Sequence, residues 1–384
     1  MKKKNIDYKF NNKIISKIFN LARETNTPLY LVGGIVRDIL IKKPNFNDFD
    51  FSYKKNINPF INKLKEKINF KTIVFNRKNF RTIRLCFKNL IIDFQKLHKN
   101  NLKKDALKRD FTVNALYMKY NSSNKFSIID HVGGLSHIKN KIIIPVSEKC
   151  FRDDPLRILR MYRLKATSNF EISQKAAVLS QKEIKNLNNI ANERIKEELI
   201  KIFNYPDFSV LNKMIEAGVF NILFESNLKK FKIKIFKNDY LLNMLSIFYE
   251  NNKIENLPNI LKDYTFSKND IKLTNIIKNI IQDTKNRVSE KKFILRYKDY
   301  QKKYIQRAFT FLKRICPEKI TSKLLKKIIQ NHKFIINGSI LMEKFNIKGE
   351  KLGKLIDNMH TYQIKNQIKN PDKLLNVFEN KKQK

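Results

Sequence analysis

Five residues in a short stretch of the chain combine a flexible backbone, a cation and two carboxylates. Gly33 and Gly34 are adjacent, and Arg37 follows three residues later. Asp48 and Asp50 lie one residue apart further along the chain. The sequence has only 8 glycines in 384 residues, so two adjacent glycines are an unusual feature of this chain. Glycine lets the backbone approach a phosphate closely, and an arginine one helical turn later can bind the same phosphate.

The acidic pair alternates with Phe49 and Phe51, which is the period of a β-strand. Asp48 and Asp50 therefore leave the same face of that strand. Two carboxylates so close repel each other unless a cation binds them, and Mg²⁺ suits a site of few carboxylates plus substrate phosphates. Such a pair can hold two ions about 3.5–4 Å apart, as in phosphoryl transfer. Asp93, inside the apolar run 90–94, is a candidate third catalytic carboxylate.

Each feature also has a simpler interpretation when it is taken alone. An acidic pair with this spacing is more often a solvent-exposed strand end, and a glycine pair is often a plain tight turn. The combination of a glycine pair, an arginine and an acidic pair within so few residues is far more specific than the glycine pair or the acidic pair alone.

The elements that must position these residues follow from the hydrophobic pattern. Up to about residue 145 the pattern predicts an α+β domain, with strands at 29–32, 48–51, 71–75, 81–87 and 90–94 and helices at 13–24, 35–42 and 57–68. Beyond this point apolar residues recur at intervals of three and four, and strand alternation disappears. The remainder is therefore expected to be all helical.

Composition narrows the partners and the compartment. The 80 Lys and Arg residues against 35 Asp and Glu give a net charge of +45, which predicts a nucleic acid partner first and an anionic membrane surface second. Cys86, Cys150 and Cys316 are isolated, so neither a zinc site nor a disulfide framework is indicated. No apolar run is long enough to span a membrane, and we expect a cytoplasmic protein.

The glycine and acidic stretches together resemble a known signature. LVGGIVRDIL followed by DFDF resembles the nucleotide-binding signature of the DNA polymerase β-like nucleotidyltransferases, and more narrowly that of class II tRNA nucleotidyltransferases and bacterial poly(A) polymerases. Four further stretches resemble the motifs of the narrower family in the same order: KRDFTVNALYM (108–118), DHVGGLSHIKNKII (130–143), FRDDPLRILRMYRLKA (151–166) and NERIKEELIKIF (192–203).

The resemblance implies a fold and a role for each matching residue. The fold is a polymerase β-like nucleotidyltransferase head at 1–145, a helical neck for base recognition at 146–205, and a helical body and tail for tRNA binding at 206–384. Asp48 and Asp50 are expected to bind the catalytic Mg²⁺ ions. The expected nucleotide-binding residues are Gly33, Gly34, Arg37, Arg109, Asp110, Asp154, Arg157, Arg160 and Arg163. The helix at 192–203 is expected to brace the nucleotide pocket from behind.

Within this set, the resemblance implies that Asp154 and Arg157 hydrogen-bond the edge of the base. An arginine offers donors and an aspartate offers acceptors, so such a pair can satisfy cytosine or adenine without a nucleic acid template. Their spacing of three predicts neighbours on one helix face. Steps of three drift around a helix, so Arg160 should flank the pair, whereas Arg163 turns away and must reach back. The simpler alternative is a surface ion pair.

The reaction implied by the resemblance is addition of the 3′-terminal CCA to tRNA from CTP and ATP, with release of pyrophosphate. A partial enzyme that adds only CC or only A, and a poly(A) polymerase, are alternatives within the family. Only fifteen residues separate Asp93 from Arg109, and a shortened loop here marks CC-adding members. The absence of a GRRF-like stretch soon after Asp50 favours tRNA over poly(A) synthesis. A non-catalytic RNA-binding protein is disfavoured because both carboxylates are present. The sequence does not indicate an oligomeric state.

Overall fold

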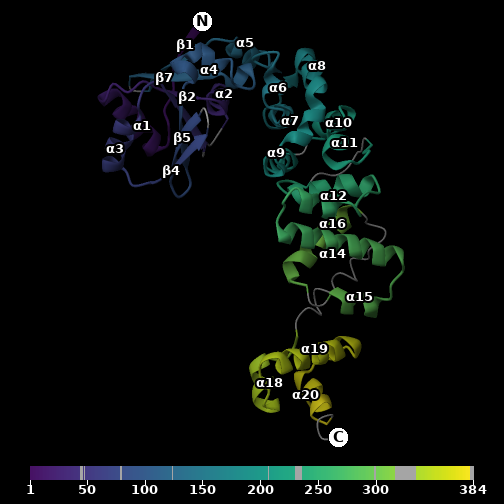
Figure 1. Ribbon diagram of the computed structural model, residues 1–384. Helices are drawn as coiled ribbons and strands as arrows, with labels where there is room; N and C mark the ends of the chain where they lie inside the picture. Colours follow the sequence, from purple (N-terminus) through teal and green to yellow (C-terminus); the bar gives the residue numbers. More distant parts are fainter. Residues whose placement is uncertain are drawn as a thin grey trace. The chain divides into compact units, whose positions relative to one another are not determined.

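The computed structural model describes residues 1–43, 46, 48–77, 80–122, 124–205, 207–229, 236–297, 300–315 and 334–380 (Figure 1). The chain divides into two compact units, Met1–Asn227 and Leu228–Lys384. The expected boundaries near residues 145 and 205 both fall inside the first unit, and the division into head, neck and body stays a prediction.

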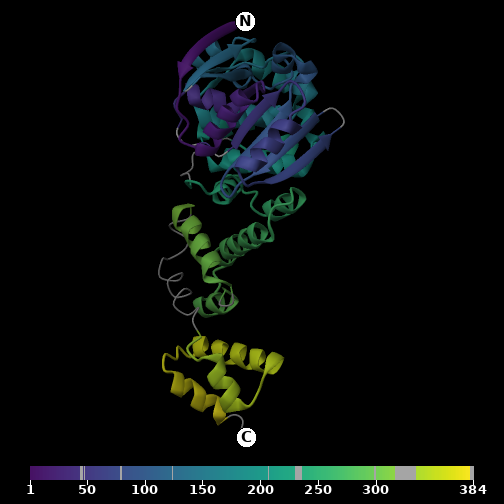
Figure 2. The same ribbon diagram turned by 90° about the vertical axis from the view of Figure 1, so that its left-hand side faces the viewer.

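An eight-stranded sheet forms the centre of the first unit, and its strands are drawn as arrows in Figure 2. Its order is β1-β8-β7-β2-β3-β6-β5-β4. All neighbouring strands of the sheet are antiparallel except β3 and β6, which run parallel. The strands are β1 (Lys2–Asp7), β2 (Leu29–Val32), β3 (Asp48–Tyr53), β4 (Lys71–Arg77), β5 (Phe80–Cys86), β6 (Ile91–Lys96), β7 (Leu116–Ser122) and β8 (Lys125–Asp130).

One face of this sheet is buried under helices α1 (Lys13–Glu24) and α3 (Asn58–Lys67), which contact each other. Phe51 and Phe94 are fully buried on that face, and their stacked rings lie 5.3 Å apart. Truncating a buried phenylalanine of this kind to alanine typically costs about 3–5 kcal/mol. Because side chains alternate along β3, burial of Phe49 and Phe51 on this face places Asp48 and Asp50 on the other one.

Helices complete the first unit around and after the sheet. They are α2 (Gly34–Leu40), α4 (Leu102–Ala106), α5 (Gly134–Lys139), α6 (Cys150–Asp153), α7 (Arg157–Ser168), α8 (Gln174–Glu183), α9 (Asn192–Asn204), α10 (Phe208–Glu216) and α11 (Val219–Phe224), with 3₁₀ turns η1 (His98–Asn100), η2 (Thr112–Asn114) and η3 (Ile184–Asn189). A second, two-stranded sheet pairs β9 (Ile142–Ile143) with β10 (Glu171–Ile172).

The second unit is helical throughout its described residues. Its helices are α12 (Tyr240–Glu250), α13 (Leu257–Asp263), α14 (Lys268–Lys285), α15 (Glu290–Tyr297), α16 (Lys302–Ile315), α18 (Gly338–Phe345), α19 (Gly349–Lys365) and α20 (Pro371–Glu379). The last three share a core that includes Leu341, Met359 and Leu374. None of the helices in the described ranges combines the length and the apolar character needed to cross a bilayer.

The α+β head followed by a helical remainder confirms the predicted fold class. Strands β2 to β6 lie where the pattern placed them, although β10 is a short strand inside the part expected to be all helical. Strands β1, β7 and β8 were not predicted. The segment KKKNID of β1 has no apolar alternation, and it is a strand because its backbone pairs with β8. Cys86 and Cys150 are free, and Cys316 lies outside the described residues.

Candidate active site

The glycine pair forms a tight turn between β2 and α2. Gly33 precedes the helix with φ +83° and ψ −150°, a backbone conformation that residues with a side chain rarely adopt. A Cβ atom added at Gly33 would lie 3.5 Å from Oδ2 of Asp50. The turn therefore lies directly beside the acidic pair, as the sequence predicted.

Replacement of Gly33 by alanine is expected to lower the free energy of unfolding by about 1–3 kcal/mol, because the alanine must keep a strained backbone conformation. Denaturant unfolding of the full chain, followed by circular dichroism, measures the change. Gly353→Ala is a control, since this glycine lies inside α19, where a new Cβ would meet no atom within 4 Å. A loss of stability in the control equal to that of Gly33→Ala would contradict the explanation.

The two carboxylates on β3 have no partner among the described residues: neither Asp48 nor Asp50 forms a side-chain hydrogen bond or an ion pair there. Burial raises the pKa of Asp50 to about 6, and the carboxylates of Asp93 and Asp48 add to this rise while Arg109 opposes it. Two unpartnered carboxylates in one pocket fit a bound divalent cation. The described residues hold no cluster of three or more potential metal ligands, so a cation here would take its remaining ligands from substrate or water.

Asp93 lies next to Asp50 across the parallel strands, since the two are register partners of β6 and β3. Its carboxylate, however, is held by Arg84 of β5 through two hydrogen bonds of 2.7 and 2.8 Å. Asp93 does not line the pocket that holds the acidic pair. Its role as a third catalytic carboxylate stays a prediction, and any such role would require Arg84 to move.

A chain of polar contacts connects Arg37 to helix α7. The Arg37 guanidinium binds Asp38 at 2.7 Å and donates to the side-chain oxygen of Asn114. Asn114 in turn donates to Asp110 at 3.1 Å, and Asp110 also accepts from Arg160 at 2.7 and 2.9 Å. Burial alone would raise the pKa of Asp110. The charge of Arg160 and these hydrogen bonds outweigh burial and hold this pKa well below its usual range. Asp110 is therefore an anion that fixes two arginines at the pocket.

Arg109 is held beside Asp50 by three other side chains. Its guanidinium pairs with Asp105 of α4 at 3.1 Å and lies within 3.4 Å of the Ser52 hydroxyl. Tyr117 donates its hydroxyl hydrogen to Asp105 at 2.7 Å, and its own oxygen accepts from Arg109 at 3.3 Å. These contacts fix the direction of Arg109 before any anion binds.

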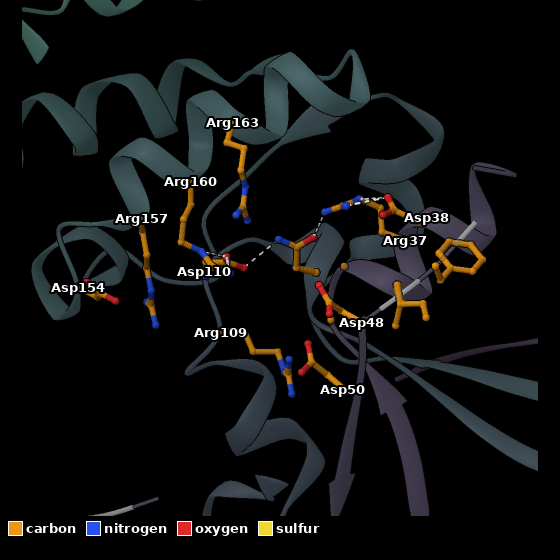
Figure 3. A pocket seen from close by; sticks show the side chains of 15 residues that line it. Arg37, Asp38, Asp48, Asp50, Arg109, Asp110, Asp154, Arg157, Arg160 and Arg163 are labelled. Atoms are coloured by element: carbon orange, nitrogen blue, oxygen red, sulfur yellow. Dashed lines mark hydrogen bonds and ion pairs between the residues drawn. The ribbon is translucent and has the colours of Figure 1, made fainter. Parts of the chain in front are cut away.

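Three arginines extend from α7 into the pocket: Arg157, Arg160 and Arg163 (Figure 3). Arg163 was expected to turn away from the site, yet it lines the pocket while its guanidinium donates to Glu198 of α9 at 3.0 Å. Glu198 is buried, so α9 braces the pocket as the sequence predicted. Arg157 donates to the main-chain carbonyls of Lys108 and Cys150 at 2.7 and 3.1 Å.

The expectation that Asp154 and Arg157 share one helix face is wrong. Helix α7 begins only at Arg157, and Asp154 has an extended backbone with φ −154° and ψ 101°. The cause is Pro155, because a proline disfavours the helical conformation in the residue before it. Asp154 accepts from Arg194 at 2.9 Å instead of pairing with Arg157. Both residues nevertheless line the same pocket.

These side chains enclose a pocket of about 550 Å³. It is lined by Gly33, Gly34, Ile35, Arg37, Asp38, Phe46, Asp48, Asp50, Arg109, Asp110, Asn114, Asp154, Arg157, Arg160 and Arg163. Figure 3 shows the acidic pair close to Arg109 and the arginines of α7 across the pocket. All the predicted nucleotide-binding residues are therefore brought together, and Asp93 alone of the predicted site residues lies outside the lining.

Sequence reasoning missed four lining residues: Ile35, Asp38, Phe46 and Asn114. Asn114 carried a usable signal, because it lies four residues after Asp110 in a stretch already singled out. Asp38 directly follows Arg37 and could have been read as its partner. Phe46 lies in a segment between two elements and has no periodic pattern to identify it.

Comparison with protein families finds two matches, the second of which ends just past the first unit. Residues 29–144 match the Poly A polymerase head domain, and residues 169–230 match the probable RNA and SrmB-binding site of polymerase A. Together with the ordered stretches and the pocket above, these matches show that this part of the chain is similar to class II tRNA nucleotidyltransferases and bacterial poly(A) polymerases.

Individual relatives include enzymes with different products. The chain is 31% identical over 212 residues to the CC-adding tRNA nucleotidyltransferase of Geobacter sulfurreducens, covering 54% of this chain and 48% of that protein. It is 30% identical over 199 residues to a CCA-adding enzyme of Lactobacillus delbrueckii subsp. bulgaricus, covering 48% of each. The chain thus spans about half the length of the curated relatives it matches.

Among solved structures, the Thermotoga maritima CCA-adding enzyme complexed with tRNA superposes with a TM-score of 0.69. The match has 22% sequence identity and covers 97% of this chain and 98% of the other. At this identity the match concerns the fold alone, and it agrees with the α+β head and helical remainder.

Proposed function

We propose that this chain is a tRNA nucleotidyltransferase that adds the 3′-terminal CCA, or part of it, from CTP and ATP without a nucleic acid template. The tRNA 3′-hydroxyl attacks the α-phosphate of the nucleotide, and pyrophosphate leaves. The observation that carries this proposal is the pocket that joins a glycine turn and two unpartnered carboxylates to an arrangement of fixed arginines.

In this proposal the protein contributes mainly position and charge. Arg37 and Arg109 bind the nucleotide phosphates, since each guanidinium is fixed in place by a carboxylate and lines the pocket beside the glycine turn. Asp110 holds Arg160 and, through Asn114, Arg37 in position. The arginines need little reorganisation when the triphosphate arrives, which lowers the cost of binding it.

Divalent metal ions are general to nucleotidyltransferases of this family, and we infer Mg²⁺ held by Asp48 and Asp50. When bound there, the ion would supply Lewis acid chemistry and neutralise phosphate charge. The two carboxylates themselves provide the negative charge that attracts it, because no arginine or lysine of the described chain pairs with either.

Base selection is assigned to Asp154 and Arg157. Asp154 pairs with Arg194 and Arg157 binds main-chain carbonyls, so both side chains exchange these partners for a base edge when a nucleotide binds. An aspartate can accept from the exocyclic amine that cytosine and adenine share, and an arginine can donate to the adjacent ring nitrogen. This pairing gives CTP and ATP a common recognition element.

The helical residues after the head are proposed to bind the tRNA backbone, within a cytoplasmic protein whose net charge is +45. Binding is therefore expected to weaken steeply with salt. If six phosphates are contacted, the affinity for tRNA should fall about 10³-fold between 50 and 200 mM salt. Fluorescence anisotropy with labelled tRNA measures this change. A fall of less than about tenfold would contradict binding through phosphates.

CC addition alone is a second candidate, and one observation favours it. The short segment between β6 and Arg109 is not a free loop, because Asp105 accepts from the main-chain N–H of His98 and pairs with Arg109. The segment is thereby fixed at both of its ends, which restricts rearrangement between the addition of C and that of A.

Incubation of the purified full chain with tRNA transcripts that lack CCA, with CTP, ATP or both, tests the proposal. Addition of CCA supports the full activity, and a stop after CC supports the second candidate. Long A tails would instead indicate poly(A) synthesis. Addition of a single A, and only to transcripts that already end in CC, would indicate an A-adding enzyme. No addition to any transcript would refute the proposed function.

A further inference from the structure

The sheet face that carries the acidic pair continues beyond it onto the strands at the β4 edge. On β6, β5 and β4, six of the side chains that point to this face form what we call the open sheet face: Lys71, Ile73, Phe75, Arg84, Ile91 and Gln95. The strand register places Ile91 next to Asp48. It also aligns Asp50, Asp93, Arg84 and Ile73 in one row across four strands. The open sheet face is therefore continuous with the acidic pair.

Three large apolar side chains on this face are exposed to solvent. Ile73 is 46% exposed, Phe75 41% and Ile91 38%. On the opposite face of β5, by contrast, Ile83 and Leu85 are buried. Exposed apolar side chains that gather on one face, rimmed by polar ones, are typical of an interaction site.

The polar groups among them favour a nucleic acid over a protein. The guanidinium of Arg84 lies over the ring of Phe75 at 5.3 Å, and Lys71 is exposed on the same face of β4. Unpaired RNA bases stack on aromatic rings and on arginine planes, while cations bind the backbone. A second copy of this chain is disfavoured as the occupant, because each copy carries a net charge of +45.

The position of the face relative to the pocket indicates which part of an RNA it can bind. The nucleotide pocket is lined from the glycine turn, α2, β3, η2, α7 and the segments next to them, and no residue of β4, β5 or β6 lines it. In the sheet, β2 and β6 lie on opposite sides of β3. From strand spacings of about 4.8 Å, Ile91 lies about 5 Å and Ile73 about 14 Å from the acidic strand. This distance is the reach of two or three nucleotides.

We propose that the open sheet face binds the last unpaired nucleotides at the 3′ end of the RNA substrate, with bases stacked on Phe75, Ile73 and Ile91. The terminal hydroxyl would then meet the nucleotide across Asp48 and Asp50, from the side that the pocket leaves free. This inference rests on the proposed function, because it requires an RNA end as the substrate.

Phe75→Ala tests the inference, with Val74→Ala as a matched control. Val74 precedes Phe75 on β4 and is 44% exposed, but its side chain points to the other face. With a tRNA transcript that ends after the first C, Phe75→Ala should raise the KM for RNA about tenfold and leave the KM for CTP unchanged. A tenfold change corresponds to about 1.4 kcal/mol. Val74→Ala should change neither constant, and equal effects of the two variants would overturn the inference.

A cross-linking experiment on the unaltered chain does not depend on any variant. A transcript with 4-thiouridine at the next-to-last position is irradiated with the protein, and the linked peptides are mapped. Links to peptides from β4, β5 or β6 support the inference, and links confined to other segments overturn it. If the unaltered chain adds no nucleotide, the proposed function fails. If the unaltered chain adds nucleotides normally, but Phe75→Ala and Val74→Ala have equal KM values for RNA, only the inference fails.

Discussion

Replacement of Asp48 by asparagine is expected to reduce nucleotide addition by at least about 10³-fold, or about 4 kcal/mol of transition-state stabilisation. Asparagine keeps the size of the side chain and removes its charge, so the pocket keeps its shape and loses half of the acidic pair. Single-turnover incorporation of labelled CTP into a tRNA transcript measures the effect. The binding of the transcript itself should be nearly unchanged, since the helical residues after the head, and not Asp48, are proposed to hold its backbone.

Asp7→Asn is the matched control for this variant. Asp7 is an exposed aspartate at the end of β1, on the same sheet and outside the pocket. The control should retain nearly full activity. Extension of tRNA by Asp48→Asn at close to the parental rate would show that the metal assignment is wrong.

Arg157→Ala is expected to change the choice of nucleotide more than the rate of chemistry. Cytosine offers a ring nitrogen acceptor where uracil has a donor, so an arginine favours CTP over UTP. A good contact to a base edge is worth about 1–3 kcal/mol of discrimination, and the CTP to UTP ratio of kcat/KM should fall about 10–100-fold. Competition between the two nucleotides on one transcript measures this ratio.

The control is Arg152→Ala. Arg152 lies on α6 close to Arg157 in sequence, but it is largely exposed and pairs with Glu183 outside the pocket. Thermal unfolding of both variants checks that loss of the Arg157 bonds to main-chain carbonyls leaves the fold intact. A loss of activity shared equally by all nucleotides would count against a role in base selection.

Short-range patterns predicted the part of the site that lies on adjacent elements. The alternation of Asp48 and Asp50 with buried phenylalanines was enough to place both carboxylates on one face, because side-chain direction along a strand is a local property. The turn at Gly33 was likewise predictable, since the strand, the glycines and the helix start are contiguous. The structure places this turn and this strand side by side.

Long-range contacts were not predictable from pattern. Nothing in the local sequence of β6 indicates that Arg84 holds Asp93, because that contact depends on the pairing of two strands. In the link from Arg37 through Asn114 to Asp110, the first contact joins Arg37 to Asn114, which lie 77 positions apart in the sequence. For Asp154 the local signal was present, in the proline that follows it, and it should have outweighed the spacing of three.

The proposed reaction depends most directly on the binding of a divalent cation by Asp48 and Asp50. Mn²⁺ is a suitable probe, because its free form gives an electron paramagnetic resonance signal that is lost when a protein binds it. In the absence of nucleotide, which would itself bind Mn²⁺, the parental chain is expected to bind Mn²⁺, and the double variant Asp48→Asn/Asp50→Asn to leave it free. Equal Mn²⁺ binding by the two proteins would contradict the account.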